Sequence, residues 1–366
     1  FVALLAGGYS PGYPCHASPK KMRTHPIGTG PFKFVSLKQN EHVKFVKNQN
    51  YWKKGLPHLD GINWTIIKSR STRVLAFVAG KFDFTFNVDV TIPLLKDVKA
   101  QAPHAICELV TTNVSFNLIV NQFKPPFDNA KIRKAMVMTM DRKAFIDILS
   151  EGQNVQGGAM MPPPSGVWGM PPEFLKTVAG YSSDVAGNRA KARKIMESLG
   201  YGPDNKLKVK VSTRNIAVYR DPAVILIDHM KEIYIDATLD TVETSNWHAK
   251  VARKDYMVGL NLTGIGVDDP DANFYENYSC GSQRNYTGYC KPEMEALFEK
   301  QSMMEDQAAR KKLVWEIDKK LQEDAARPMI MHGKAAQCWQ PYVKGFVTHV
   351  NSIYNNWRME DVWLDK

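Results

Sequence analysis

One segment of the chain has the pattern of a catalytic serine. Residues 8–12, GYSPG, match the Gly-x-Ser-x-Gly turn that presents a nucleophile in α/β hydrolases. In such enzymes the backbone N–H of the residue after the serine helps to bind the oxyanion. Here that residue is Pro11, which has no N–H, and Pro14 disfavours the helix that must follow. We therefore predict no serine hydrolase and no catalytic residue.

Other patterns of chemical interest are incomplete. Asp269-Pro270-Asp271 begins like a calcium loop, but Phe274 and Cys280 stand where the loop needs Gly and Glu. Residues 28–30 and 264–266 lack the third glycine of a dinucleotide fingerprint. The nine histidines show no HExxH spacing, and no CxxC pair is present. The sequence therefore predicts no metal site and no cofactor.

Two of the five cysteines, Cys280 and Cys290, are close in sequence. The segment between them is rich in Gly, Ser and Asn, which favours a loop closed by a disulfide. Such a bond requires an oxidising compartment. Two unrelated thiols are the alternative.

Charge and hydropathy exclude further classes. The 366 residues include 48 Lys and Arg against 37 Asp and Glu, a net charge of +11, but these charges are spread along the chain. A spread excess is typical of a solvated surface and not of nucleic-acid binding. The longest apolar runs, such as residues 1–6, are shorter than the roughly 18 residues of a membrane span. The chain starts without Met and without basic residues before this run, so we expect it to belong to a longer protein.

The elements that would position functional residues alternate in type. From about residue 185, helices and strands alternate, which indicates an α/β lobe with a largely parallel sheet. The expected helices are 188–199, 222–233 with Pro222 in the first turn, 246–253, 292–304 and 306–326, and the expected strands are 207–212, 237–242, 256–263 and 328–331. Before them we expect strands at 32–37, 42–47, 62–67 and 113–121, and helices at 70–79 and 129–149. A proline-rich loop at 161–172 separates the two regions.

A series of blocks in fixed order carries a resemblance to a known family. The blocks are residues 25–34 (HPIGTGPFKF), 46–52 (VKNQNYW), 59–62 (LDGI), 71–73 with 79–83, 125–128 with 132–135 and 141–142, 268–271 with Phe274, and 289–293. They resemble consecutive segments of the family 5 extracytoplasmic solute-binding proteins, which serve ABC importers of dipeptides, oligopeptides, nickel and related solutes. The order and spacing agree from about residue 25 to the end.

The resemblance implies an α/β, two-lobed periplasmic binding protein of type II-like architecture. In this family a hinge joins the lobes, the solute is enclosed between them, and a small extra domain is inserted in the first lobe. By that pattern 27–112 and 336–366 form lobe I and 113–335 form lobe II. Residues 1–26 are the tail of the insertion, which is largely absent from this chain.

Most candidate ligand-binding residues lie at the ends of predicted strands, and two lie in the 113–121 strand at the lobe junction, where Asn and Ser are available to the floor of the cleft. Ligands of open α/β sheets lie beyond the carboxyl ends of strands, and Arg214 there has the geometry to pair with a solute carboxylate. A solvated surface charge is the alternative for Arg214, and an ordinary polar strand face is the alternative for the 113–121 strand. The candidates are Asn113, Ser115, Arg214, Asn215, Thr263, Gly264, Ile265, Gly266 and Asp268.

One departure from the family pattern bears on the solute. Peptide-binding relatives often carry an Asp shortly after the 256–263 strand, where it holds the α-amino group of the peptide. Here that position falls near Ile265, and Asp268 is the candidate replacement. Peptide specificity is therefore the default of the family and not a property of this segment.

The resemblance implies that the chain is most of a periplasmic solute-binding component of an ABC importer. It would capture a peptide or similar solute by hinge closure and deliver it to a membrane permease. The expected partners are the ligand, the permease and the missing N-terminal segment, without nucleic acid. The expected location is the bacterial periplasm, reached through a signal peptide not present in this chain. The alternatives are an enzyme on a two-lobed scaffold, or a binder of nickel, opines or sugar-like solutes.

Overall fold

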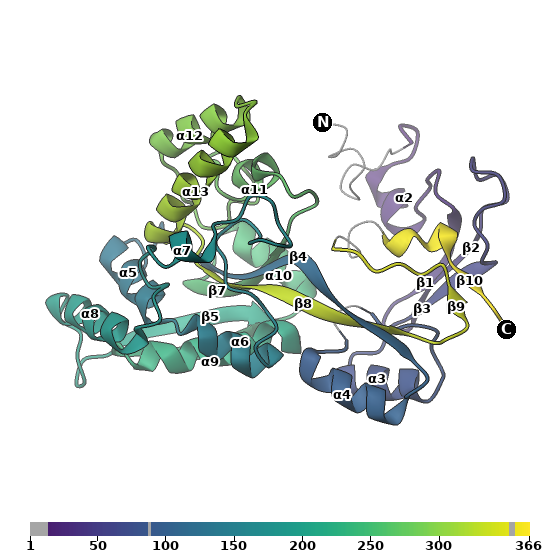
Figure 1. Ribbon diagram of the computed structural model, residues 1–366, viewed down its shortest axis with the longest axis horizontal. Helices are drawn as coiled ribbons and strands as arrows, with labels where there is room; N and C mark the ends of the chain where they lie inside the picture. Colours follow the sequence, from purple (N-terminus) through teal and green to yellow (C-terminus); the bar gives the residue numbers. More distant parts are fainter. Residues whose placement is uncertain (1–13, 87–88, 351–355) are drawn as a thin grey trace. The chain divides into compact units, whose positions relative to one another are not determined.

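The computed structural model describes residues 14–86, 89–350 and 356–366 (Figure 1). The GYSPG segment and half of the predicted insertion tail lie outside the described residues. The chain divides into unit 1, Phe1–Thr112 with Lys334–Lys366, and unit 2, Asn113–Gly333. Two strands, β4 (Ile106–Val120) and β8 (Met329–Trp339), contain the boundaries at which the chain enters and leaves unit 2.

Unit 1 contains an antiparallel three-stranded sheet in the order β1-β2-β3. Its inward face packs with Trp339, Val343 and Phe346 from the end of the chain. Its elements are α2 (Pro19–Thr24), β1 (Phe32–Lys38), β2 (His42–Lys47), β3 (Gly61–Thr65), α3 (Arg70–Val78), α4 (Ile92–Gln101), β9 (Val343–Lys344), the 3-10 helix Asn356–Asp361 and β10 (Trp363–Leu364).

A second apolar cluster of unit 1 surrounds a disulfide that the sequence analysis did not predict. Cys107 on β4 is bonded to Cys338 on β8, across 231 positions of the sequence. Cys338 is fully buried against Val74 and Phe77 of α3. The bond therefore joins the two strands that connect the units, at a point inside unit 1.

Unit 2 is built on a five-stranded sheet in the order β6-β5-β7-β4-β8. Its further elements are α5 (Ala130–Thr139), α6 (Arg142–Ser150), α7 (Pro172–Leu175), α8 (Val185–Ser198), β5 (Leu207–Arg214), α9 (Ala217–Lys231), β6 (Ile235–Val242), α10 (Thr244–Ala252), β7 (Val258–Gly264), α11 (Pro270–Asn277), α12 (Pro292–Ser302) and α13 (Gln307–Glu323). The main core lies between this sheet and helices α5, α8 and α9.

The sheet is mixed, so the prediction of a largely parallel sheet holds only for part of it. β5 is parallel to β6 and β7, whereas β4 is antiparallel to β7. The reason lies in the path of the chain. The chain enters unit 2 through β4 at the end of the sheet where β7 finishes. From there β4 runs in the direction opposite to β7.

Two predicted helices were wrong in their extent. The single helix expected at 129–149 is two helices, because Asp141 caps α6 by accepting a hydrogen bond from the Ala144 N–H at 3.0 Å. The helix expected to begin at Pro222 begins at Ala217 instead, and Pro222 lies inside it. Pro222 cannot donate to the carbonyl of Val218, but its ring is buried in the core.

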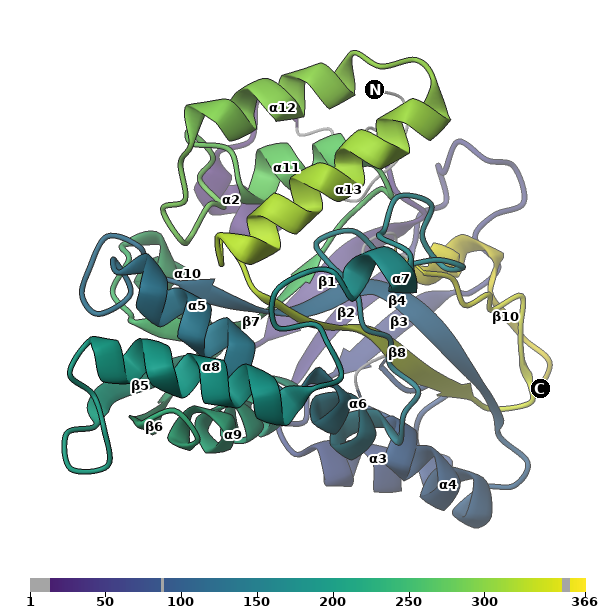
Figure 2. The same ribbon diagram turned by 60° about the vertical axis from the view of Figure 1, so that its left-hand side comes forward.

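A helical group formed by α11, α12 and α13 completes unit 2 (Figure 2). Its core contains Phe274, Phe298 and Ile317, and the proline-rich loop contributes Met160 and Trp168 to the same cluster. Asp269 caps α11 by accepting from the Asp271 N–H at 2.9 Å. This carboxylate therefore has the role of a helix cap in the segment that resembled a calcium loop.

None of the helices in the described part of the chain is long and apolar enough to cross a membrane.

We predict that the Cys107→Ser substitution lowers the free energy of unfolding by roughly 2–5 kcal/mol, measured by urea denaturation without reductant. The Cys280→Ser substitution should cost less, because Cys280 and Cys290 are separated by only 10 positions and a short loop loses less entropy on closure. The Cys15→Ser substitution is the control, since Cys15 is exposed and unpaired. Equal effects of all three substitutions would contradict the prediction.

Candidate functional site

Most of the predicted ligand-binding residues lie at one edge of the unit 2 sheet. β5 and β7 are parallel, so both end there, and the paired part of β4 begins there. Ser115 is paired with Thr263 and Val114 with Gly264. The turn after β7 is fixed to the start of β4, because the Ile265 N–H donates to the carbonyl of Asn113 at 3.2 Å and the Asn113 amide donates to the carbonyl of Ile265. Gly266 lies in the bend that follows.

The polar side chains of β4 and β7 bind one another across the two strands. Asn117 Nδ2 donates to Thr263 Oγ1 at 3.0 Å, and Asn261 Nδ2 donates to the same oxygen at 3.2 Å. Ser115 Oγ donates to the carbonyl of Thr263 at 3.3 Å. All four side chains are buried. This cluster fixes the register of the two strands and positions the turn at Gly264 and Ile265.

Arg214, the last residue of β5, has different surroundings. Thr213 Oγ1 donates to the carbonyl of Leu260 at 3.1 Å, so β5 ends beside the middle of β7. Arg214 Nη1 donates to the hydroxyl of Tyr219 at 3.0 Å, and its guanidinium lies 4.9 Å from the centroid of the same ring. Its Nη2 lies 2.6 Å from Nε2 of His248 on α10. No carboxylate of the described residues forms an ion pair with Arg214.

Two residues beside Arg214, Asn215 and His248, differ in their hydrogen bonding and exposure. Asn215 Nδ2 donates to Glu243 Oε1 at 3.4 Å, a contact between the end of β5 and the residue before α10. His248 is exposed. Partial burial, followed by the positive charges of Arg214 and Arg284, lowers the pKa of His248 below its ordinary value. Arg214 is thus held by an aromatic hydroxyl and a neutral imidazole.

Asp268 is bound to the proline-rich loop. Its Oδ2 accepts from the Val167 N–H at 2.8 Å, and its carbonyl accepts from Trp168 Nε1 at 2.9 Å. Burial raises the pKa of Asp268, an effect that the Val167 hydrogen bond opposes. One oxygen of the predicted replacement for the amine-binding Asp is therefore already committed to the protein's own backbone.

The proline-rich loop is tightly packed on itself. A Cβ at Gly166 would lie 2.1 Å from the carbonyl oxygen of Met161, and one at Gly169 would lie 2.3 Å from it. Trp168, between these glycines, lies under the guanidinium of Arg310, whose carbon is 4.6 Å from the ring centroid. Arg310 also pairs with Asp269 at 3.1 Å. The loop is therefore joined to the segment after β7 by several contacts.

A buried carboxylate on α13 anchors the start of the same loop. Asp318 Oδ1 accepts from the Ala159 N–H at 2.8 Å, and Oδ2 accepts from the Met160 N–H at 3.3 Å. Burial raises the pKa of Asp318 to about 6. Beside it, fully buried His332 donates from Nε2 to the carbonyl of Gly158 at 2.8 Å, and burial lowers its pKa to about 4.

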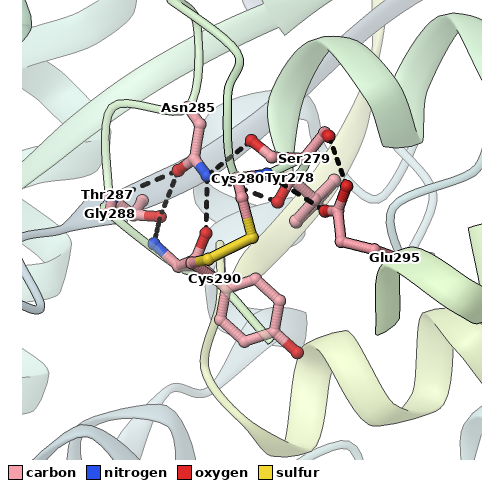
Figure 3. Close-up of a disulfide and its surroundings, with 9 residues drawn as sticks. Tyr278, Ser279, Cys280, Asn285, Thr287, Gly288, Cys290 and Glu295 are labelled. Atoms are coloured by element: carbon pink, nitrogen blue, oxygen red, sulfur yellow. Dashed lines mark hydrogen bonds between the residues drawn. A yellow bond between two sulfur atoms is a disulfide. The ribbon is translucent and has the colours of Figure 1, made fainter. Parts of the chain in front are cut away.

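Cys280 and Cys290 close a loop by a disulfide (Figure 3). The positive charge of Arg284 in this loop contributes to lowering the pKa of His248. The interior of the loop is organised by Asn285, which is buried. Asn285 Nδ2 contacts the carbonyl of Tyr289 at 2.6 Å, and its Oδ1 accepts from the Gly288 N–H at 3.1 Å. At the other end of the loop, Glu295 Oε1 accepts from the Cys280 N–H at 3.0 Å.

The contacts of Arg214 with Tyr219 and His248, and the charge of Arg284 that acts on His248, were not predicted from the sequence. Tyr219 lies five residues after Arg214, near the start of α9. This short separation is only a weak indication that the two side chains are in contact. His248 and Arg284 come from a later helix and from the disulfide loop. Only the arrangement of the elements brings them near the end of β5, so no sequence pattern identified them.

The fold and this edge define a class of protein, the α/β periplasmic binding proteins. The model of the bacterial extracellular solute-binding proteins, family 5 Middle, matches residues 4–285, and the chain belongs to this family. The predictions of this family and of its fold are thus confirmed. The family is one of binding proteins, which also supports the prediction that the chain is not an enzyme.

Relatives of known function are distant in sequence. Heme-binding protein A of Haemophilus influenzae is 24% identical over 95% of this chain and 62% of its own length. The glutathione-binding protein GsiB of Salmonella paratyphi A is 25% identical over 70% of this chain and 48% of its own length. The chain therefore spans about half to two thirds of the length of these relatives.

Solved structures share the fold. The oligopeptide-binding protein OppA of Haemophilus influenzae, in complex with the peptide RPPGFSPFR, has a TM-score of 0.82 at 20% identity. That match covers 93% of this chain and 65% of OppA. DppA of Helicobacter pylori, in complex with the peptide STSA, has a TM-score of 0.80 at 22% identity over 93% of this chain and 64% of DppA.

We predict opposite effects of pH at Asp318 and His332. The pKa of Asp318 is raised on folding, so its contribution to stability is present at low pH and is lost as the pH rises toward about 6. The pKa of His332 is lowered on folding, so its contribution is lost as the pH falls from about 6.5 to about 4. The Asp318→Asn variant should therefore lose more stability than the wild type on acidification from pH 7 to pH 4.

Urea denaturation across this pH range measures the effect. The Asp204→Asn variant, at an exposed position before β5, is the control for the loss of one negative charge. The same pH dependence in Asp318→Asn and in the wild type would disprove the assignment.

Proposed function

We propose that the chain is part of the solute-binding component of a bacterial ABC importer, and that it selects solutes by a carboxylate group bound at Arg214. The observation that carries the proposal is the position of Arg214. Arg214 is the last residue of β5, at the carboxyl edge of the unit 2 sheet. It contacts Tyr219 and His248, and no carboxylate in the described part of the chain forms an ion pair with it. A bidentate pair with a solute carboxylate suits a guanidinium in this state.

The family and its relatives support a carboxylate-bearing solute. The solved relatives bind peptides, and one sequence relative is a glutathione-binding protein. Peptides and glutathione carry free carboxylates. The periplasm and a membrane permease, as location and partner, follow from the importer proposal. Hinge closure around the solute remains a prediction from the family pattern.

Recognition of a free α-amino group has less support. By the family pattern, the position where peptide-binding relatives often carry an Asp falls near Ile265, and Asp268 Oδ2 accepts a hydrogen bond from the Val167 N–H. We therefore propose that the carboxylate end of the solute contributes more to affinity than the amino end. Opines fit the same chemistry, whereas nickel and neutral sugars do not require Arg214.

We predict that tripeptides with free termini stabilise the chain in a thermal-shift assay, and that C-terminal amidation weakens binding by about 10- to 100-fold, the value of one charged hydrogen-bonded pair. Acetylation of the amino terminus should weaken binding by less than about threefold. Arg214→Met should remove the preference for free carboxylates. Arg253→Met, at an exposed position after α10, is the matched control.

A panel of glutathione, hemin, opines, nickel and neutral sugars tests the alternatives. Saturable binding of nickel or a neutral sugar that Arg214→Met leaves unchanged would reject the carboxylate proposal. Conversion of any solute to a product would favour the alternative of an enzyme.

A further inference from the structure

The surroundings of Arg214 contain a proton-accepting group as well as a positive charge. An arginine only donates hydrogen bonds, so His248 Nε2, 2.6 Å from Arg214 Nη2, is the acceptor. The imidazole is therefore neutral, with its proton on Nδ1. Arg214 Nε is buried and has no hydrogen-bond partner in the described part of the chain.

The charges that face His248 are mostly positive. Arg214 approaches from β5 and Arg284 from the disulfide loop. Arg284 is partly neutralised by Glu276, at 2.9 Å. On α10 itself, Lys250 is shared between carboxylates of β6 and of the turn before β7, Asp240 at 3.7 Å and Asp255 at 3.6 Å. Glu243, before α10, accepts from the side chain of Asn215.

Elsewhere in unit 2, an arginine near the start of α13 is paired with two carboxylates. Arg310 has Asp269 at 3.1 Å and Asp271 at 3.5 Å as its partners. Arg214 has a neutral imidazole in the place where Arg310 has carboxylates. The difference indicates that the position of the imidazole is where an external anion fits.

We propose that His248 couples ligand binding at Arg214 to the uptake of one proton. An incoming carboxylate replaces His248 Nε2 as the acceptor of the Arg214 Nη2–H. The released Nε2 takes a proton from solvent and donates it in a hydrogen bond to the carboxylate. No other bond is made or broken. The inference rests on the proposed function, because it needs an anion at Arg214.

The direction of the pH effect follows from charge. Without ligand, the cations beside His248 oppose its protonation. A bound carboxylate favours protonation, so the pKa of His248 rises on binding. By linkage, the affinity for the carboxylate increases as the pH falls between the two pKa values, by at most about tenfold per pH unit for one proton.

Acetate tests the coupling without knowledge of the natural solute. The titration of His248 is followed by NMR of the imidazole Cε1–H signal at constant ionic strength, with His248→Gln to assign the signal. We expect acetate to raise the pKa of His248 in the wild type and to have no effect in Arg214→Met. Acetamide, which is neutral, is the control probe. The signal of His58, exposed in unit 1, reports nonspecific effects.

Calorimetry with a free tripeptide and with its amide gives the second measurement. In two buffers of different ionisation enthalpy, the wild type should take up a fraction of one proton per tripeptide at pH 6–7, and none with the amide. His248→Gln should take up no proton with saturating tripeptide or with its amide. This substitution is at an exposed position, so it should not disturb folding.

The outcomes separate the inference from the function on which it rests. If Arg214→Met lowers tripeptide affinity but His248→Gln still takes up the proton, the proton coupling is rejected and the carboxylate site stands. An acetate effect that persists in Arg214→Met also rejects the coupling. If Arg214→Met leaves tripeptide affinity unchanged, both proposals fail.

Discussion

The pairing of β4 with β7 is the constraint on which the arrangement of unit 2 depends. Seven residue pairs, from Val114 with Gly264 to Val120 with Val258, join the strand that enters the unit to a strand from its centre. A shift by one residue would turn every buried side chain of β4 to the other face of the sheet. The hydrogen bond from Asn117 on β4 to Thr263 on β7 is satisfied only in this register. The β4–β7 pairing therefore determines where the turn after β7 lies on the sheet.

Local chemistry explains which parts of the fold could be predicted. Strands β1, β2 and β3 of unit 1 and β5, β6 and β7 of unit 2 lie close to their expected positions, because apolar alternation and turn residues mark them directly. The strands expected at 113–121 and 328–331 were too short, since β4 begins at Ile106 and β8 extends to Trp339. The single helix expected at 129–149 was wrong because a capping carboxylate, Asp141, was not recognised within an apolar pattern. Pro222 was placed at a helix start, although burial of its ring allows it inside α9. The first of these helix errors is a missed local capping signal, whereas the second is tertiary context overriding a local preference.

The candidate site was predictable only where it follows strand ends. Arg214 and the turn at Gly264 could be selected because open α/β sheets bind ligands beyond the carboxyl ends of their strands. The partners of Arg214 could not be selected, since Tyr219 gives only a weak local signal and His248 comes from α10, 34 positions further along the chain. The net charge of +11 did not indicate Arg214 as a binding residue. Arg214 is distinguished by the lack of an ion-pair partner among the described carboxylates, and total charge does not report that. Arg310, equally cationic, is fully paired and has a structural role.

The disulfide between Cys107 and Cys338 makes unit 2 a covalent ring. Both strands that connect it to unit 1 are held together at a Cα–Cα distance of 4.1 Å, and every residue from 113 to 333 lies between the two cysteines. A protease that cuts one loop of unit 2 therefore produces two fragments that remain one molecule until the bond is reduced. Strands β4 and β8, which connect the units, likewise stay joined at the disulfide while unit 2 unfolds and refolds. The bond lies inside unit 1, and unit 2 is the large loop that it closes.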